Sequence, residues 1–296
     1  MNETPLVTVN ILSFNRKDEL RNTLTKVYEQ DYKNIEVIVV DNASVDGSAE
    51  MVKTEFPKVQ LIQLEKNIGI AGWNEGFKIA NGEYVLVLDD DAYPAKDAIS
   101  LSIPEFENDE LISCIAYNLI NTRTGEHYQN NWLPKNKNRR TFWPVFVGCA
   151  FIVKKNRLPK TFIFPQEYFI YQHELPMASE IYIYNKKILF IPQIIGYHNF
   201  KINQSYESFN DKMNFKNTLK FITDYIPYSF WMLYYFQIVL FYLTRSIRHK
   251  WFYDYGKILF STNPIAIRTK IPYSYFFLLR VLKVFNYSLL SKFLNI

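Results

Sequence analysis

Residues 84–91 read Tyr-Val-Leu-Val-Leu-Asp-Asp-Asp, an apolar run that passes without a break into three aspartates. A short continuous apolar run of this kind is typical of a strand that is buried on both faces of a sheet. Residues 8–12, 36–40 and 59–64 have the same character, and the stretches between them fit helices. Strands that alternate with helices in this way predict a parallel α/β sheet with right-handed crossovers.

Polar side chains directly follow three of these predicted strands. The first strand leads into Ser13-Phe14-Asn15-Arg16, the second into a turn at residues 41–48, and the fourth into residues 89–91. Ligands of open α/β sheets bind outside the carboxyl ends of the strands, so we expect these segments to form one site. Adjacent carboxylates repel one another, and Mg²⁺ or Mn²⁺ bound with a substrate phosphate would offset the repulsion. A solvated loop before the next helix is the alternative.

Three other features each have two interpretations. Residues 67–76 place three glycines and two asparagines around a helix start, which fits close approach to a ligand or tight helix–sheet packing. His173-Glu174 lies at a polar break and fits an acid–base pair or a surface turn. His198 follows a strand predicted at residues 187–191 and fits a ligand or a structural role. Beyond Pro94 we predict mixed strands, among them one at residues 145–153, in an acceptor-binding half.

Composition excludes several classes of protein. The chain has 296 residues, of which 48% are hydrophobic and 21% charged, and this excludes a disordered or fibrous chain. Two cysteines cannot form a disulfide scaffold or a four-thiolate metal site. No signal peptide is visible at the start of the sequence, so we expect a cytoplasmic location.

The last third of the chain is basic and aromatic. Residues 1–200 carry 21 Lys and Arg against 25 Asp and Glu, whereas residues 201–296 carry 13 against 4. Residues 228–243 contain no charged side chain, but they fall short of the ~20 residues that a membrane-spanning helix needs. Basic helices with aromatic flanks, as here and at residues 273–294, bind anionic membrane surfaces. Packing on the catalytic domain or on another subunit is the alternative, and nucleic acid is disfavoured because no recognised binding module is present.

Four motifs, at residues 9–16, 39–48, 67–76 and 88–91, resemble in their order and spacing the family 2 glycosyltransferases with the A-type nucleotide-sugar fold. The resemblance is closest to the bacterial rhamnosyl- and galactofuranosyl-transferase-like branch. It implies an α/β fold, a Rossmann-like mostly parallel sheet flanked by helices, followed by a helical, basic, aromatic-rich extension.

The resemblance also implies a domain division and an activity. Residues 1–205 would form the nucleotide-sugar-binding catalytic domain and residues 206–296 the membrane-associating or subunit-packing helical region. The enzyme would move one sugar, with inversion and with Mn²⁺ or Mg²⁺, from a UDP- or dTDP-sugar to a hydroxyl of a glycan or lipid-linked glycan in surface polysaccharide synthesis. The enzyme would work in the cytoplasm, bound peripherally to the inner face of the membrane. The resemblance does not decide whether the chain forms a homo-oligomer.

Site residues follow from the same resemblance. The implied metal ligands are Asp89, Asp91 and His198. The implied nucleotide-binding residues are Ser13, Asn15, Arg16, Asp41, Asn42, Asn67, Gly72, Asn74, Asp89 and Asp90. Asp41 would bind the pyrimidine edge, and Glu174 would be the general base.

One departure concerns the acid–base position. The branch usually has an acidic pair at this point, and His173 replaces its first member here. Pro176 replaces the acidic residue that usually follows two places beyond the base. A catalytically weak nucleotide-sugar-binding subunit of a glycan assembly complex is therefore the alternative function. A nucleotidyltransferase is disfavoured because the glycine-rich activating loop is missing, and the absence of a Gln-x-x-Arg-Trp motif favours transfer of single sugars.

Overall fold

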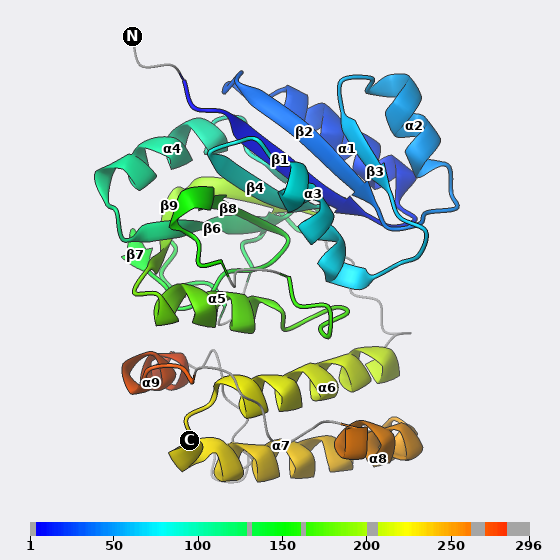
Figure 1. Ribbon diagram of the computed structural model, residues 1–296, viewed down its shortest axis with the longest axis vertical. Coiled ribbons are helices and arrows are strands. Elements are labelled where there is room, and N and C mark those ends of the chain that lie inside the picture. Colours follow the sequence, from blue (N-terminus) through cyan, green and yellow to red (C-terminus); the bar gives the residue numbers. More distant parts are fainter. Residues whose placement is uncertain (1–3, 129–131, 161–163, 200–206, 262–269, 283–296) are drawn as a thin grey trace.

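The first half of the chain forms four parallel strands, as the sequence predicts. These are β1 (Val7–Ser13), β2 (Ile35–Asp41), β3 (Gln60–Gln63) and β4 (Tyr84–Asp89). β1 lies between β2 and β4, and β3 pairs with the other side of β2 (Figure 1). The computed structural model describes residues 4–128, 132–160, 164–199, 207–261 and 270–282. The apolar runs of β1 and β4 are buried because helices cover both faces of the sheet.

Helical segments connect these strands and cover the sheet. They are α1 (Lys17–Tyr28), α2 (Ser48–Glu55), the 3₁₀ turn η1 (Gly69–Gly72) and α3 (Trp73–Ile79). A Cβ atom at Gly76 would come within 2.1 Å of Asn10 Oδ1, and one at Gly72 within 2.4 Å of Leu12 Cδ1. Glycine at these two positions therefore lets α3 pack directly on β1, which is one of the two interpretations of residues 67–76.

The second half of the chain adds mixed strands to the same sheet. Its elements are β5 (Ala92–Pro94), α4 (Ala98–Asn108), β6 (Ile112–Asn121), β7 (Thr141–Phe142), β8 (Ala150–Lys154), η2 (Lys155–Arg157), α5 (Glu174–Ile183) and β9 (Lys187–His198). The strand order is β3-β2-β1-β4-β8-β6-β9-β5, with β7 on β9. β8 runs antiparallel between β4 and β6, so the sheet changes from parallel to mixed at this point.

Two predicted strand boundaries are wrong. The strand predicted at residues 145–153 begins only at Ala150, because the preceding residues turn away from the sheet and bring Gly148 to Glu174. β9 extends well beyond residue 191, because β5 and β6 supply pairing partners as far as His198. This extension carries His198 to the end of β4.

The C-terminal region forms a separate helical layer. Its helices are α6 (Glu207–Tyr225), α7 (Tyr228–Arg248), α8 (Phe252–Ser261) and α9 (Tyr273–Val281). In Figure 1, α6 lies below α5, and α7 with α8 lies farthest from the sheet. The helix predicted at residues 273–294 runs only to Val281, and residues from 283 onward lie outside the described part of the chain. Among the described helices, none combines the length and the apolar character that crossing a bilayer requires.

The sequence did not predict α6, whose exposed and buried faces are both rich in polar residues. Asn217 Nδ2 donates hydrogen bonds to the carbonyls of Ile170 and Tyr171, at 2.7 and 2.8 Å. Gln172 Nε2 donates to Asn214 Oδ1 at 3.2 Å. The polar residues of α6 therefore support the loop that leads into His173 and Glu174.

Candidate active site

Three polar segments meet at the carboxyl ends of β1, β2 and β4. Ser13 pairs with Asp41 in the β1–β2 register, and Leu12 pairs with Asp89 in the β1–β4 register. Asn42 N donates to Ser13 O at 2.8 Å, which joins the two turns. The sheet thus brings together the segments that the sequence predicts to form one site.

The turn after β1 is fixed to the turn after β2. Asn15, whose φ is 53°, receives a hydrogen bond from Val45 N on its Oδ1 at 2.8 Å. Asn15 N donates to Ser44 Oγ at 2.9 Å. Asp41 is buried, and its Oδ1 accepts from Ser44 N at 3.2 Å. These contacts hold Asp41 at the base of a rigid double turn.

Asp89, Asp91 and His198 form the cluster that could hold a metal ion. One ligand atom from each lies within 4.8 Å of the others, and His198 Nε2 lies 3.0 Å from Asp91 Oδ1. Asp89 ends β4, and Asp91 lies in the turn before β5, whose first residue, Ala92, pairs with His198. Two carboxylates and one imidazole suit Mn²⁺ or Mg²⁺ bound together with a diphosphate, so these residues fit the cation that the sequence predicts.

Asp90 points away from this cluster and holds the turn after β1. Its Oδ2 accepts from Phe14 N at 3.0 Å, and its Oδ1 lies 3.2 Å from Arg16 Nη1. The same Arg16 nitrogen lies 2.6 Å from Asp91 Oδ2, while half of the Arg16 side chain is exposed. Arg16 therefore reaches from the surface into the aspartate run and partly neutralises it.

The aspartate run holds more negative charge than its buried position favours. Burial, and then the charge of Asp91, raises the pKa of Asp89 to about 7. Burial also raises the pKa of Asp90 to about 7, although Arg16 opposes this. Burial opposes ionisation of Asp91 too, but the hydrogen bond and charge of His198 and the charge of Arg16 together outweigh it and hold the pKa of Asp91 below its ordinary value. A bound cation would favour the ionised carboxylates at this position.

Tyr128 is a further residue of this cluster that the sequence did not predict. Its hydroxyl forms a hydrogen bond with His198 Nδ1, and its ring stacks on the imidazole with centroids 5.8 Å apart. Metal-binding histidines usually have their second nitrogen hydrogen-bonded in this way, which fixes the ring orientation. No local pattern marks Tyr128, because the contact joins segments 70 residues apart.

Glu174 is the first residue of α5, and both it and His173 are buried. Glu174 Oε1 accepts from Gly148 N at 3.1 Å, and Oε2 has no hydrogen-bond partner among the described residues. His173 Nδ1 lies 3.5 Å from Glu174 Oε2. Burial lowers the pKa of His173, so its imidazole is neutral at pH 7. The two residues are therefore buried, which excludes the surface turn that was the alternative, and their acid–base role stays a prediction.

The backbone before β8 joins Glu174 to the metal cluster. Gly148 binds Glu174 Oε1, and the carbonyl of the next residue, Cys149, accepts from Asp89 N at 3.0 Å. A Cβ atom at residue 148 would come within 2.5 Å of His173 Nε2, so the approach requires glycine. One short segment thus holds the predicted base beside the end of β4.

Asparagines of the predicted nucleotide-binding set are engaged within the fold. Asn42 Nδ2 donates to Gly69 O at 3.0 Å and its Oδ1 accepts from Ile68 N at 2.9 Å. Asn67 Oδ1 accepts from Gly69 N at 2.8 Å. Asn74 binds the carbonyl and the amide of Phe164, at 2.8 and 2.9 Å. These side chains position loops at the strand ends, and direct contact with a nucleotide remains a prediction for them.

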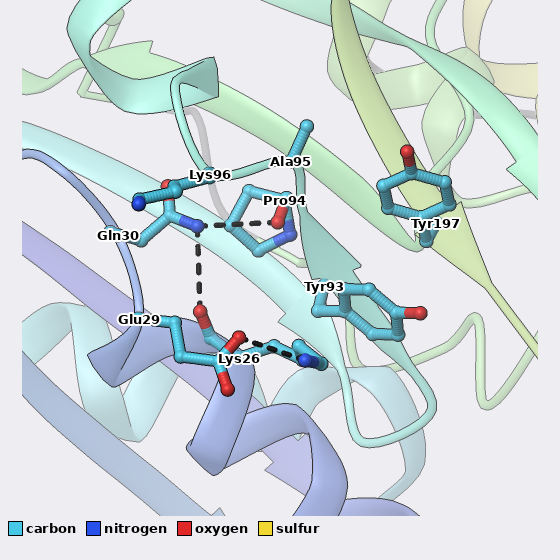
Figure 2. Close-up of a pocket in the computed structure, with 8 residues that line it drawn as sticks. All are labelled: Lys26, Glu29, Gln30, Tyr93, Pro94, Ala95, Lys96 and Tyr197. Atoms are coloured by element: carbon cyan, nitrogen blue, oxygen red, sulfur yellow. Dashed lines mark hydrogen bonds and ion pairs between the residues drawn. The ribbon is translucent and has the colours of Figure 1, made fainter.

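A hollow on another side of the sheet does not belong to this site. Figure 2 shows Gln30 between α1 and β5, with its Nε2 donating to Pro94 O at 3.2 Å and to Lys26 O at 3.4 Å. Lys26 is in turn paired with Glu29 at 2.8 Å. None of the predicted site residues lines this hollow.

Comparisons with known proteins identify the family of this chain. The model of the family described as "Glycosyl transferase family 2" matches residues 8–171. The putative teichuronic acid biosynthesis glycosyltransferase TuaG of Bacillus subtilis is 33% identical over 103 residues, 33% of this chain and 40% of the relative. WfaP of Escherichia coli, named UDP-Glc:alpha-D-GlcNAc-diphosphoundecaprenol beta-1,3-glucosyltransferase, is 33% identical over 109 residues, 36% of this chain and 43% of the relative. The chain thus spans less than half the length of these relatives.

Solved structures share the fold. The mannosyltransferase PcManGT from Pyrobaculum calidifontis, in complex with GDP-Man and Mn²⁺, superposes with a TM-score of 0.59 at 19% identity, over 88% of this chain and 75% of that one. GalNAc-T7 with UDP, GalNAc and Mn²⁺ superposes with a TM-score of 0.61 at 15% identity, over 80% of this chain and 51% of that one. At these identities the likeness shows the A-type glycosyltransferase fold. Since the family model matches more than half of the sequence, the chain belongs to glycosyl transferase family 2.

Proposed function

We propose that this chain is an inverting, metal-dependent glycosyltransferase that moves one sugar from a UDP- or dTDP-sugar to a hydroxyl group. The observation that carries the proposal is the position of Glu174 beside the Asp89, Asp91 and His198 cluster, through the Gly148–Cys149 backbone. A carboxylate base and a candidate diphosphate-binding cluster are the two groups that displacement at an anomeric carbon requires.

In the proposed reaction the chain's own residues bind, orient and accept a proton. Glu174 Oε2, which has no partner among the described residues, accepts the proton of the acceptor hydroxyl. The acceptor oxygen then attacks the anomeric carbon from the face opposite the nucleotide, and the nucleoside diphosphate leaves with the bonding electrons. A cation held by Asp89, Asp91 and His198 would stabilise the charge on that leaving diphosphate. Arg16 is placed to contribute further positive charge.

The acceptor and the place of work are inferred from the motifs and the relatives. TuaG is named for teichuronic acid biosynthesis, and the name of WfaP describes a diphosphoundecaprenol-linked acceptor. We infer a glycan or lipid-linked glycan acceptor in bacterial surface polysaccharide synthesis, in the rhamnosyl- and galactofuranosyl-transferase-like branch. The expected location is the cytoplasmic face of an anionic membrane.

The direct test is the release of nucleoside diphosphate from a panel of nucleotide sugars, with Mn²⁺ and with a chelator. We expect metal-dependent release from at least one UDP- or dTDP-sugar. A protein that binds these nucleotides but never cleaves a donor, with any acceptor fraction, would instead be the nucleotide-sugar-binding subunit. The replacement of the usual first acid by His173 is the observation that favours this second candidate.

Pyrimidine preference is expected to depend on Asp41. A carboxylate oxygen can accept the ring N–H of uracil or thymine, which cytosine lacks at that edge, so UDP or dTDP should bind better than CDP or GDP. Asp41→Asn should weaken UDP binding about tenfold or more, the effect of losing a hydrogen bond to a charged group. Calorimetry with the four nucleotides measures this, and Glu50→Gln, an exposed carboxylate of α2, is the matched control. A purine preference in the unmodified protein would contradict the assignment.

Arg16 is expected to affect nucleotide and metal binding in opposite directions. Its guanidinium contacts Asp91, so Arg16→Gln should strengthen the binding of Mn²⁺ alone by removing a competing cation. The same change should weaken binding of the nucleoside diphosphate with saturating Mn²⁺ about tenfold or more, because a charge-assisted contact is lost. Calorimetry measures both affinities. Arg21→Gln, on α1, whose side chain pairs with Asp18 of α1 and Glu55 of α2, should change neither.

A further inference from the structure

The solvent side of α7 is apolar along most of its length. Tyr228, Met232, Phe236, Leu240 and Ile247 are exposed to 74%, 59%, 55%, 52% and 63%, respectively. Their spacing of four, four, four and seven residues places them on one face of a helix. The opposite face packs inward on the rest of the helical layer. The usual arrangement of a surface helix, with polar residues toward water, is therefore reversed here.

The neighbouring helices extend this face. Tyr255 OH of α8 donates to Val239 O of α7 at 2.9 Å, and Ser229 Oγ of α7 lies 2.8 Å from Tyr273 OH of α9. Both helices add exposed apolar side chains, and α7 with α8 lies farthest from the sheet in Figure 1. We call the exposed apolar residues of the three helices the outer apolar face. Its members are Tyr228, Met232, Leu233, Phe236, Leu240, Ile247, Phe252, Tyr253, Phe260, Tyr273 and Phe277.

More than half of the exposed large apolar side chains of the described residues lie on this face. Soluble chains rarely expose contiguous apolar patches of this extent unless a partner covers them. Of the helices that carry this face, α7 and α8 lie farthest from the sheet in Figure 1, whereas α9 lies level with α6. The face therefore serves a purpose separate from the donor site.

The charges of the helical layer select an anionic partner. The described acidic side chains in α6, α7 and α8 are all engaged in ion pairs with basic residues of these helices, and of the remaining basic residues Lys257 lies near enough to Asp254 to interact with its charge. These pairs are Asp211–Arg245, Asp224–Lys220 and Asp254–Lys212. Arg248, Lys250 and Lys257 are exposed, and none of them forms an ion pair with a described carboxylate within 4.0 Å.

We propose that the outer apolar face rests on an anionic membrane surface. The apolar and aromatic side chains of α7 and α8 enter the interfacial region, and Arg248, Lys250 and Lys257 meet the lipid phosphates. A second copy of the chain is a poorer fit, because it would bring the same unpaired bases face to face. The inference rests on the proposed function for the membrane location and adds the surface of the chain that makes the contact.

Vesicle flotation of the full chain tests this proposal. We expect binding to phosphatidylcholine vesicles that contain phosphatidylglycerol, weakened by salt, and little binding to phosphatidylcholine alone. The pair Phe236→Ser and Leu240→Ser should lower the partition coefficient about tenfold or more, because less apolar surface leaves water on binding. The pair Ile79→Ser and Leu101→Ser, with exposures of 41% and 40% on the catalytic domain, is the matched control.

The charge contribution is tested by Arg248→Gln with Lys250→Gln. This pair should lower binding to anionic vesicles about thirtyfold, because each basic residue near an anionic surface contributes about 1 kcal/mol, and should not change binding to neutral vesicles. Lys58→Gln with Lys66→Gln, two exposed bases of the catalytic domain, is the control pair.

Three outcomes would overturn the proposal. The first is equal binding to neutral and anionic vesicles, and the second is unchanged flotation of the Phe236→Ser and Leu240→Ser variant. The third is a dimer, measured by light scattering, that these two substitutions dissociate, together with no binding to any vesicle. Sugar transfer to a soluble acceptor is measured in parallel. Transfer without flotation would refute the membrane-binding surface and keep the proposed function. Flotation without transfer would refute the proposed function and keep the membrane-binding surface.

Discussion

Asp91→Asn should abolish metal-dependent nucleotide binding, with at least about a hundredfold loss of affinity for UDP in the presence of Mn²⁺. The expected size follows from the effect of removing a direct ligand, since loss of an outer contact to a ligand alone typically costs 10–100-fold. Asp91 contacts both His198 and Arg16, so its replacement also separates the two halves of the cluster. Calorimetry with UDP, with and without Mn²⁺, measures the effect.

His198→Ala should weaken the same binding less, because Asp89 and Asp91 remain. Asp97→Asn is a matched control, as its carboxylate is exposed at the start of α4, six residues from Asp91. Thermal unfolding without nucleotide separates lost binding from lost folding. Unchanged metal-dependent affinity in both site variants would exclude the cluster as the metal site.

Glu174→Gln should leave donor binding intact while sugar transfer falls by at least about a hundredfold, the usual contribution of a positioned base. A glutamine oxygen can still accept from Gly148 N, as Glu174 Oε1 does at 3.1 Å, so the local structure should be kept. The amide cannot take the proton of the acceptor hydroxyl. Transfer rates at saturating donor and acceptor, together with donor affinity by calorimetry, distinguish the two effects.

The same measurements on His173→Ala assign the base. His173 packs on Trp73 and Phe164, with ring centroids 5.9 and 6.1 Å away, so its loss should disturb the site through packing and move donor affinity as well as rate. Glu75→Gln, a partly exposed carboxylate of α3, controls for the change of charge. Near-normal transfer by Glu174→Gln, with His173→Ala inactive and donor binding retained, would assign the base to His173.

The sequence alone predicted the four parallel strands and the edge at which the site lies. Strand identity could be predicted because buried parallel strands are short apolar runs, and this is a local property. The rule that ligands bind at the carboxyl ends of such strands then selected Ser13, Asp41 and Asp89 without further information. The family resemblance supplied the candidate ligands and the candidate base.

The tertiary structure decided which side chains have atoms available for chemistry. Asn42 and Asn74 have both polar atoms engaged by distant loops, whereas Glu174 has one oxygen without a partner among the described residues. Asp90 holds the turn after β1, because the turn that follows β4 directs its carboxylate to Phe14 N and Arg16. Sequence spacing carries no information on such contacts between remote segments.

Boundaries and surfaces were decided in the same way. β9 reaches His198 because β5 and β6 supply partners, and Tyr128 meets His198 because the segment after β6 folds back along that strand. α6 was missed because its polar residues bind the loop before His173 instead of facing water. The apolar side chains at positions 228–243 were visible in the sequence, but which of them face solvent depends on how α7 packs on its neighbours. Local composition specifies which elements form, and long-range packing determines which of their atoms remain free to bind.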